Sequence, residues 1–219
     1  MNDLMIFDGD NEVQHQRDLT LKQATLVFVS MCVVTTILSR VIYAPCDDAY
    51  IFYVYVRNFL AGDGLTYNGT VVWGFTSVLW TGALSMVALL GIPVHVGGEL
   101  LSTVSGWLAL WATYFLGRSV GLSRLYAFVP VLLLAATGDF IFYSSVGLEQ
   151  VFFTGLVATA AALVFSKHYM QKGGVVSTAG IMAAMVLTRP EGALLSALLL
   201  LAILAELRSI RTPLRGVVA

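Results

Sequence analysis

Two adjacent aspartates, Asp47 and Asp48, follow the first long apolar stretch of the sequence. Neighbouring carboxylates repel each other and lose hydration beside apolar surface, which favours proton uptake by one of them and makes it a candidate general base. The pair also offers oxygen ligands to a divalent cation. A structural role is the alternative, because aspartate is a favourable N-cap and the pattern predicts a helix over residues 49–61. Spacing alone leaves both interpretations open.

Tyr50, Tyr53 and Arg57 share one face of that predicted helix through their i, i+3, i+7 spacing. An aromatic helix of this kind is typical of a membrane interface, where an arginine reaches lipid headgroups. The sharper hypothesis is that Arg57 binds the phosphate of a lipid substrate, because a guanidinium fork matches phosphate oxygens.

Aromatic side chains alternate with small hydroxyl and amide residues further along the chain. Exposed rings beside hydrogen-bonding groups suit stacking on a sugar and binding of its hydroxyls, although interfacial aromatics need no such role. The aromatic, hydroxyl and amide residues predicted to contact a substrate are Tyr50, Tyr67, Asn68, Trp73, Thr76, Ser77 and Trp80.

Two further polar clusters interrupt the apolar sequence, at residues 144–150 and 188–192. Glu149 precedes an apolar segment, where a helix N-terminus favours a carboxylate. Arg189 and Glu191 flank a proline and are costly at membrane depth unless they are paired or hydrated. Arg189 could form a structural ion pair or bind a phosphate, and the sequence leaves both alternatives open. Glu149 and Glu191 are candidate substrate contacts.

The elements that must position these residues are apolar helices. The chain is 58% hydrophobic and 11% charged, whereas soluble domains are about 25% charged. A net charge near zero gives no reason to expect a nucleic-acid partner. The sequence predicts an all-α polytopic membrane protein with about six transmembrane helices, at 24–43, 100–116, 125–140, 151–165, 175–187 and 193–205. A seventh apolar stretch, 78–92, is predicted to be re-entrant or interfacial.

Positive charge supports that interpretation of residues 78–92. If this stretch does not cross, nine of the twelve lysines and arginines lie on one side, which is then cytoplasmic. The predicted organisation is a cytoplasmic tail at 1–23, a transmembrane domain at 24–206 with an extracytoplasmic loop at 44–99, and a basic cytoplasmic tail at 207–219. The polar clusters would then open together on the extracytoplasmic face of the cell membrane.

The order of these motifs resembles bacterial GT-C glycosyltransferases, most closely the branch that contains the terminal arabinofuranosyltransferases. The resemblance runs from residue 45 to 192, about the N-terminal half of such enzymes. The matching segments are Asp47-Asp48-Ala-Tyr-Ile, Arg57-Asn58, Gly62-Asp-Gly64-Leu-Thr-Tyr67-Asn68, Gly74-Phe75-Thr76-Ser77-Val-Leu-Trp80, Gly147-Leu-Glu149 and Arg189-Pro190-Glu191-Gly192.

The resemblance implies an inverting, GT-C-like enzyme that takes a sugar from a polyprenyl-phosphate donor in the membrane lipid. The acceptor would be a cell-envelope glycan, lipid or protein. Asp47, slightly preferred over Asp48, would be the catalytic base, and Arg57 or Arg189 would hold the donor phosphate. A second chain that supplies a C-terminal half is an implied partner, and a divalent cation is a candidate cofactor.

Two other classes of function fit the composition. A transporter or flippase would line a path with intramembrane charges, although its polar residues would gather at mid-membrane rather than on one face. A non-catalytic membrane subunit of a split enzyme would use the same helices to bind a partner chain. The sequence contains no phosphate-binding glycine loop and no cluster of cysteines and histidines for a metal.

Overall fold

The computed structural model describes residues 18–72 and 74–211, with side chains as far as residue 209, and it is predominantly helical. Three of its helices are long and apolar enough to cross a membrane. They are α2 (Leu21–Val41), α5 (Val94–Ser119) and α10 (Glu191–Arg211). The prediction of a mainly helical protein is therefore confirmed, and these three helices have the length and apolarity that a membrane span requires.

The other predicted spans are helical but shorter. Residues 151–165 and 175–187 form α8 (Gln150–Phe165) and α9 (Gly174–Thr188). The predicted continuous helix at 125–140 is wrong, because the structure divides it into α6 (Phe128–Ala135) and α7 (Gly138–Tyr143). The break falls at Thr137, whose extended backbone makes it the N-cap of α7. Threonine and the glycine that follows it are weak helix formers.

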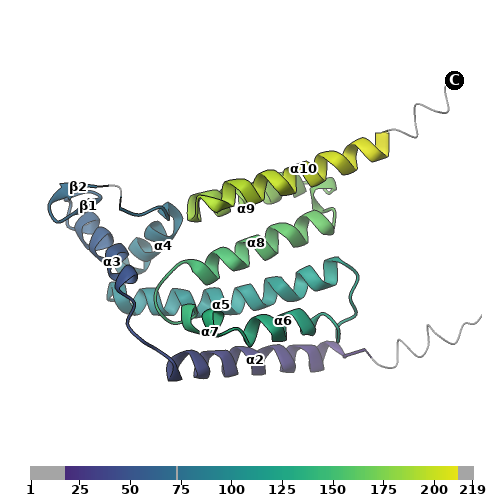
Figure 1. The fold of residues 1–219 in the computed structure, drawn as a ribbon, viewed down its shortest axis with the longest axis horizontal. Coiled ribbons are helices and arrows are strands. Elements are labelled where there is room, and N and C mark those ends of the chain that lie inside the picture. Colours follow the sequence, from purple (N-terminus) through teal and green to yellow (C-terminus); the bar gives the residue numbers. More distant parts are fainter. Residues whose placement is uncertain (1–17, 73, 212–219) are drawn as a thin grey trace, which may run out of the picture.

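Two helices and a hairpin lie outside the row of longer helices, at one end of it (Figure 1). They are α3 (Asp47–Leu60), the strands β1 (Thr66–Tyr67) and β2 (Thr70–Val71), and α4 (Val78–Leu89). Asn68 and Gly69 have φ values of 52° and 76° and connect the two strands. Asn-Gly suits such a turn because both residues tolerate positive φ.

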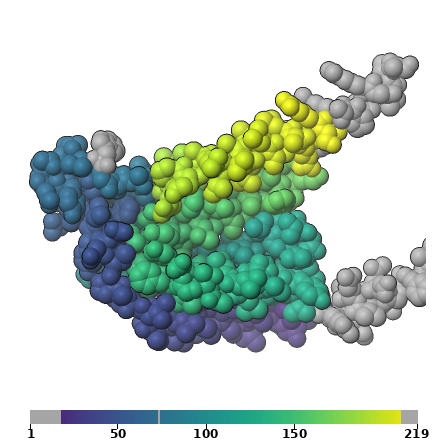
Figure 2. Space-filling model, viewed as in Figure 1, coloured from purple at the N-terminus to yellow at the C-terminus, as the bar shows by residue number. Residues whose placement is uncertain are grey.

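The helix row holds together through close backbone packing. Helices α5 and α8 lie side by side (Figure 1), and a Cβ added at Gly155 would lie 3.3 Å from the Cα of Ala109. Small residues permit such approaches between membrane helices. Leu110 and Val131 are fully buried in the core that α5 and α6 share. Figure 2 shows the α3–α4 unit forming a lobe at the end of this row.

The polar segments gather at that same end. Figure 1 shows the end of α2, the start of α5, the α7–α8 connection and the α9–α10 connection beside α3 and α4. The α5–α6 and α8–α9 connections, the latter carrying the short helix η1 (His168–Met170), lie at the opposite end. Which end faces the cytoplasm stays a prediction.

Candidate functional site

Gly147 is the point at which α3, α4 and the α7–α8 connection meet. Its φ is +83°, and a side chain there would collide with the Tyr53 hydroxyl. The indole N–H of Trp80 donates to the Gly147 carbonyl at 3.1 Å. The backbone can approach α3 this closely because glycine has no Cβ. The polar cluster at residues 144–150 is therefore in direct contact with α3 and α4.

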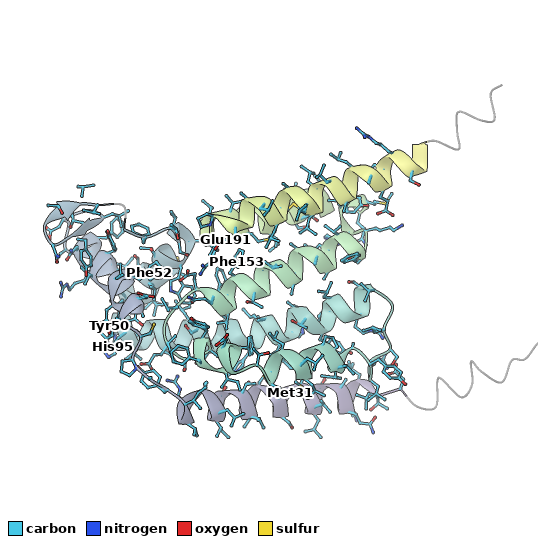
Figure 3. All side chains as sticks on the ribbon, viewed as in Figure 1. Met31, Tyr50, Phe52, His95, Phe153 and Glu191 are labelled. Atoms are coloured by element: carbon cyan, nitrogen blue, oxygen red, sulfur yellow. The ribbon has the colours of Figure 1, made fainter. Side chains whose placement is uncertain are left out.

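Arg189 joins the polar cluster at residues 188–192 to the one at residues 144–150. Its guanidinium lies 2.9 Å from Glu149 and 3.3 Å from Glu191. Arg189 therefore forms the structural ion pair that the sequence left open. It has Glu149 as an additional partner, which the spacing did not predict. Glu149 is 5% exposed, and Figure 3 shows Glu191 at the start of α10, above the part of α8 that carries Phe153.

Burial raises the pKa of the Glu149 carboxyl, and the positive charge of Arg189 opposes that rise. Glu149 occupies the N-cap position of α8 without forming a side-chain capping bond. Its predicted position at a helix N-terminus is confirmed, but its carboxylate binds Arg189 rather than capping the helix.

Four buried side-chain oxygens have no hydrogen-bond partner within the described residues. They are Oε2 of Glu149, Oε1 of the neighbouring Gln150, Oγ of Ser77 and Oγ1 of Thr178. Buried oxygens without hydrogen bonds are uncommon in proteins and call for an explanation. Ser77 and Glu149 were predicted as substrate contacts. Gln150 was not, because a glutamine at the start of an apolar helix carries no distinctive signal.

Asp47 and Asp48 form the first turn of α3. The N-cap is Cys46, so the structural alternative, in which an aspartate caps this helix, is wrong. Both carboxylates are exposed, and no hydrogen bond or ion pair to them exists in the part of the chain that the structure describes. Among the described residues no group of three or more His, Cys, Asp or Glu could hold a metal. Within the part of the chain that the structure describes, Asp47 and Asp48 thus have no third acidic, histidine or cysteine side chain grouped with them.

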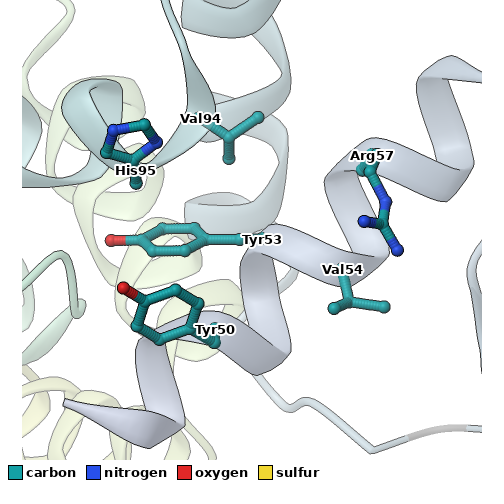
Figure 4. A pocket seen from close by; sticks show the side chains of 6 residues that line it. All are labelled: Tyr50, Tyr53, Val54, Arg57, Val94 and His95. Carbon is teal, nitrogen blue, oxygen red and sulfur yellow. The ribbon is translucent and has the colours of Figure 1, made fainter. Parts of the chain in front are cut away.

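The predicted face of α3 lines a hollow of about 280 Å³ (Figure 4). Tyr50 and Tyr53 pack edge to face, with ring centroids 5.4 Å apart. His95, at the start of α5, lies over the Tyr53 ring, and Arg57 stands further along the helix (Figure 4). The Arg57 side chain has no hydrogen-bond or ion-pair partner among the described residues. Sequence reasoning missed His95, since an isolated histidine gives no spacing signal.

A second ion pair beside this hollow was also missed. Glu99 lies 2.7 Å from Arg40 and accepts a hydrogen bond from Tyr43 at 3.1 Å. Burial and the Glu99 carboxylate raise the pKa of the Tyr43 phenol. This pair fastens the end of α2 to the start of α5.

The remaining predicted substrate contacts are dispersed. Trp80 is 1% exposed, so the expectation of an exposed ring is wrong, because its indole is buried against Gly147 and Phe152. Tyr67 is half-buried against Tyr55. Exposed positions belong to Asn68, at the hairpin turn, and to Thr76, whereas Trp73 lies outside the described residues.

Among the described residues, the end of the helix row thus presents carboxylates and an arginine without ion-pair partners, the arginine in an aromatic hollow, together with buried oxygens that lack donors. This set can remove a proton, bind an anion and orient hydroxyl groups. No protein-family model, curated protein or solved structure matches the chain.

Proposed function

We propose that this protein is a membrane glycosyltransferase that moves a sugar from a polyprenyl-phosphate donor to a hydroxyl of a cell-envelope acceptor. The observation that carries the proposal is that α3, the helix of Asp47, Asp48 and Arg57, lies at the same end of the helix row as the connections that the Arg189–Glu149 pair joins. A GT-C-like reaction on the extracytoplasmic face needs these groups together and close to lipid.

The chemistry follows from the donor. The acceptor hydroxyl gives its proton to Asp47 or Asp48, and its oxygen forms a bond to the anomeric carbon of the sugar. The bond from that carbon to the phosphate oxygen breaks, and the polyprenyl phosphate leaves with the electron pair. A carboxylate supplies the base and an arginine supplies the charge that the leaving phosphate requires.

Arg57 is better suited than Arg189 to bind the phosphate. Two carboxylates already lie within 3.3 Å of Arg189. They neutralise the guanidinium charge, so Arg189 attracts an incoming phosphate less strongly. Arg57 has no such partner among the described residues and lines a hollow with Tyr50 and Tyr53. The role proposed for Arg189 is to position Glu149.

The test is sugar transfer in membranes that contain the full chain, supplied with polyprenyl-phosphate pentoses and hexoses. Replacing both Asp47 and Asp48 with asparagine is expected to abolish transfer, and Arg57→Gln to reduce it at least tenfold. Asp63→Asn is the matched control, because Asp63 is exposed and follows the same helix. Wild-type transfer by the double aspartate variant would overturn the proposal.

A further inference from the structure

A groove of about 380 Å³ runs between α5 and α8, toward the end of the helix row that lies opposite the candidate site (Figure 1). Trp111 and Phe115 line it from α5, with ring centroids 4.4 Å apart, and Leu163 lines it from α8. The small, buried side chains of Ala112 and Ala162 leave room between the two helices. Because Trp111 and Phe115 are about half exposed, this apolar groove opens on the surface of the helix row.

One end of the groove is polar, and Arg118, Ser119 and Ser166 line it there. Both serine hydroxyls donate to carbonyls of their own helices, at 2.8 Å and 3.3 Å. One guanidinium nitrogen of Arg118 donates to the Leu122 carbonyl at 2.6 Å, and Arg118 has no ion-pair partner among the described residues. The other N–H groups of this positive fork are therefore the donors left for a ligand, and they suit an anion with several oxygens.

The surrounding charge also favours an anion. In the part of the chain that the structure describes, this end of the helix row carries two acidic residues, Asp18 and Glu206, against six basic ones. The basic residues are Lys22, Arg118, Arg124, Lys167, Lys172 and Arg208. The C-termini of α5 and α8 add a partial negative charge of about one half each, which the basic side chains outweigh. Basic clusters between membrane helices at the membrane surface attract anionic lipid headgroups.

The length of the groove distinguishes a lipid from a partner helix as its occupant. From Trp111 to Ser119, α5 rises about 12 Å at about 1.5 Å per residue. The hydrocarbon core of a bilayer is about 30 Å thick, so one leaflet is about 15 Å deep. The groove thus matches one acyl chain in one leaflet, whereas a spanning helix needs about twice that length. Helix α5 itself is long and apolar enough to cross a membrane.

We propose that this groove binds an anionic phospholipid of the bilayer, with one acyl chain between α5 and α8 and the headgroup phosphate on the Arg118 guanidinium. Trp111 and Phe115 contact the chain, and Arg118 selects the charge of the headgroup. The site goes beyond the proposed function, because it lies at the opposite end of the helix row from Asp47 and Asp48 and needs neither a sugar donor nor transfer.

The experiment measures quenching of Trp111 fluorescence by phospholipids that are brominated on an acyl chain. The purified full chain is reconstituted in phosphatidylcholine vesicles that contain an increasing fraction of brominated phosphatidylglycerol or brominated phosphatidylcholine. The Trp111 signal is the difference between the wild-type chain and Trp111→Phe, which keeps an aromatic wall. Phosphatidylglycerol is expected to reach half-maximal quenching at an about fivefold lower lipid fraction, the factor that corresponds to about 1 kcal/mol for one basic side chain near anionic lipid.

Two variants separate the headgroup from the chain. Arg118→Gln is expected to make phosphatidylglycerol quench no better than phosphatidylcholine, whereas Phe115→Ala is expected to weaken quenching by both lipids. Arg124→Gln is the matched control and is expected to keep the preference for phosphatidylglycerol. Arg124 is exposed at the same end and also donates to a backbone carbonyl, that of Leu19 at 3.1 Å, but it does not line the groove.

Three outcomes overturn this proposal. Equal quenching of the wild-type chain by the two lipids rules out recognition of the headgroup. An equal loss of preference in Arg118→Gln and Arg124→Gln assigns the preference to the general surface potential instead of the groove. Absence of Trp111 quenching by either lipid shows that protein, such as a second copy of the chain, covers the groove. None of these results depends on the aspartate variants, so the two proposals fail or stand separately.

Discussion

Replacement of Arg189 by alanine leaves a buried carboxylate without its counter-charge. The Glu149 side chain is 7% exposed and lies 2.9 Å from the guanidinium. Removing one partner of a buried ion pair typically costs about 3–5 kcal/mol. An upper limit follows from proton uptake, because the folded chain can protonate Glu149 instead. An ordinary glutamate has a pKa of about 4.3, which is about 2.7 units below pH 7. Protonating Glu149 at pH 7 therefore costs about 3.7 kcal/mol, at about 1.36 kcal/mol per unit.

The expected loss of unfolding free energy in Arg189→Ala is therefore about 3–4 kcal/mol at pH 7. Burial already raises the pKa of Glu149 in the folded protein, and removal of Arg189 raises it further. A raised folded-state pKa leaves stability intact below the unfolded pKa and reduces it as pH rises through the folded one. The deficit of the variant should accordingly vanish near pH 4 and grow toward neutrality.

The assay is unfolding of the full chain in mixed micelles, followed by tryptophan fluorescence from pH 4 to 8. Glu149→Gln combined with Arg189→Ala should recover most of the loss, because glutamine carries no charge to bury. Glu191→Gln is the control and should change stability little, since the Glu191 side chain is 59% exposed. A deficit in Arg189→Ala that is independent of pH, or one that Glu149→Gln fails to relieve, would refute this reasoning.

Three further predictions concern the contacts around the site. Gly147→Ala should lower the unfolding free energy by about 3 kcal/mol or more, because the residue has φ +83° and faces Tyr53. Gly82→Ala is the control in the same denaturation assay and should be neutral or stabilising, because the space around Gly82 is open. Trp80→Phe should cost about 1–3 kcal/mol by removing the donor to a buried carbonyl, measured by the same unfolding curve. Arg40→Gln should cost less than about 1 kcal/mol and depend on salt, because the pair with Glu99 is partly exposed.

The helices of this protein could be predicted largely from apolar runs and their interruptions. Residues 24–43 and 151–165 lie almost entirely in α2 and α8, because uninterrupted apolar residues leave the backbone no partner but itself in lipid. The face shared by Tyr50, Tyr53 and Arg57 was also predictable, since it depends only on helical period. The hairpin at Asn68-Gly69 carried a recognisable turn signal that our sequence interpretation assigned to substrate contact instead.

The partners of the polar side chains were not predictable in this way. Arg189 binds Glu149 across 40 residues, and Arg40 binds Glu99 across 59. Trp80 is buried because the Gly147 carbonyl, 67 residues away, accepts its indole N–H. No local period or propensity encodes such distances.

By itself, the sequence determined that the chain forms apolar helices and that its charged and hydroxyl residues cluster where those helices end. Tertiary structure alone decided which of these residues pair, which stay free and which are sealed from solvent. The physical reason is that helical period and hydropathy act over a few neighbouring residues. Pairing and burial depend instead on how helices distant in the chain approach one another, as at Gly147, where a missing side chain lets two of them meet.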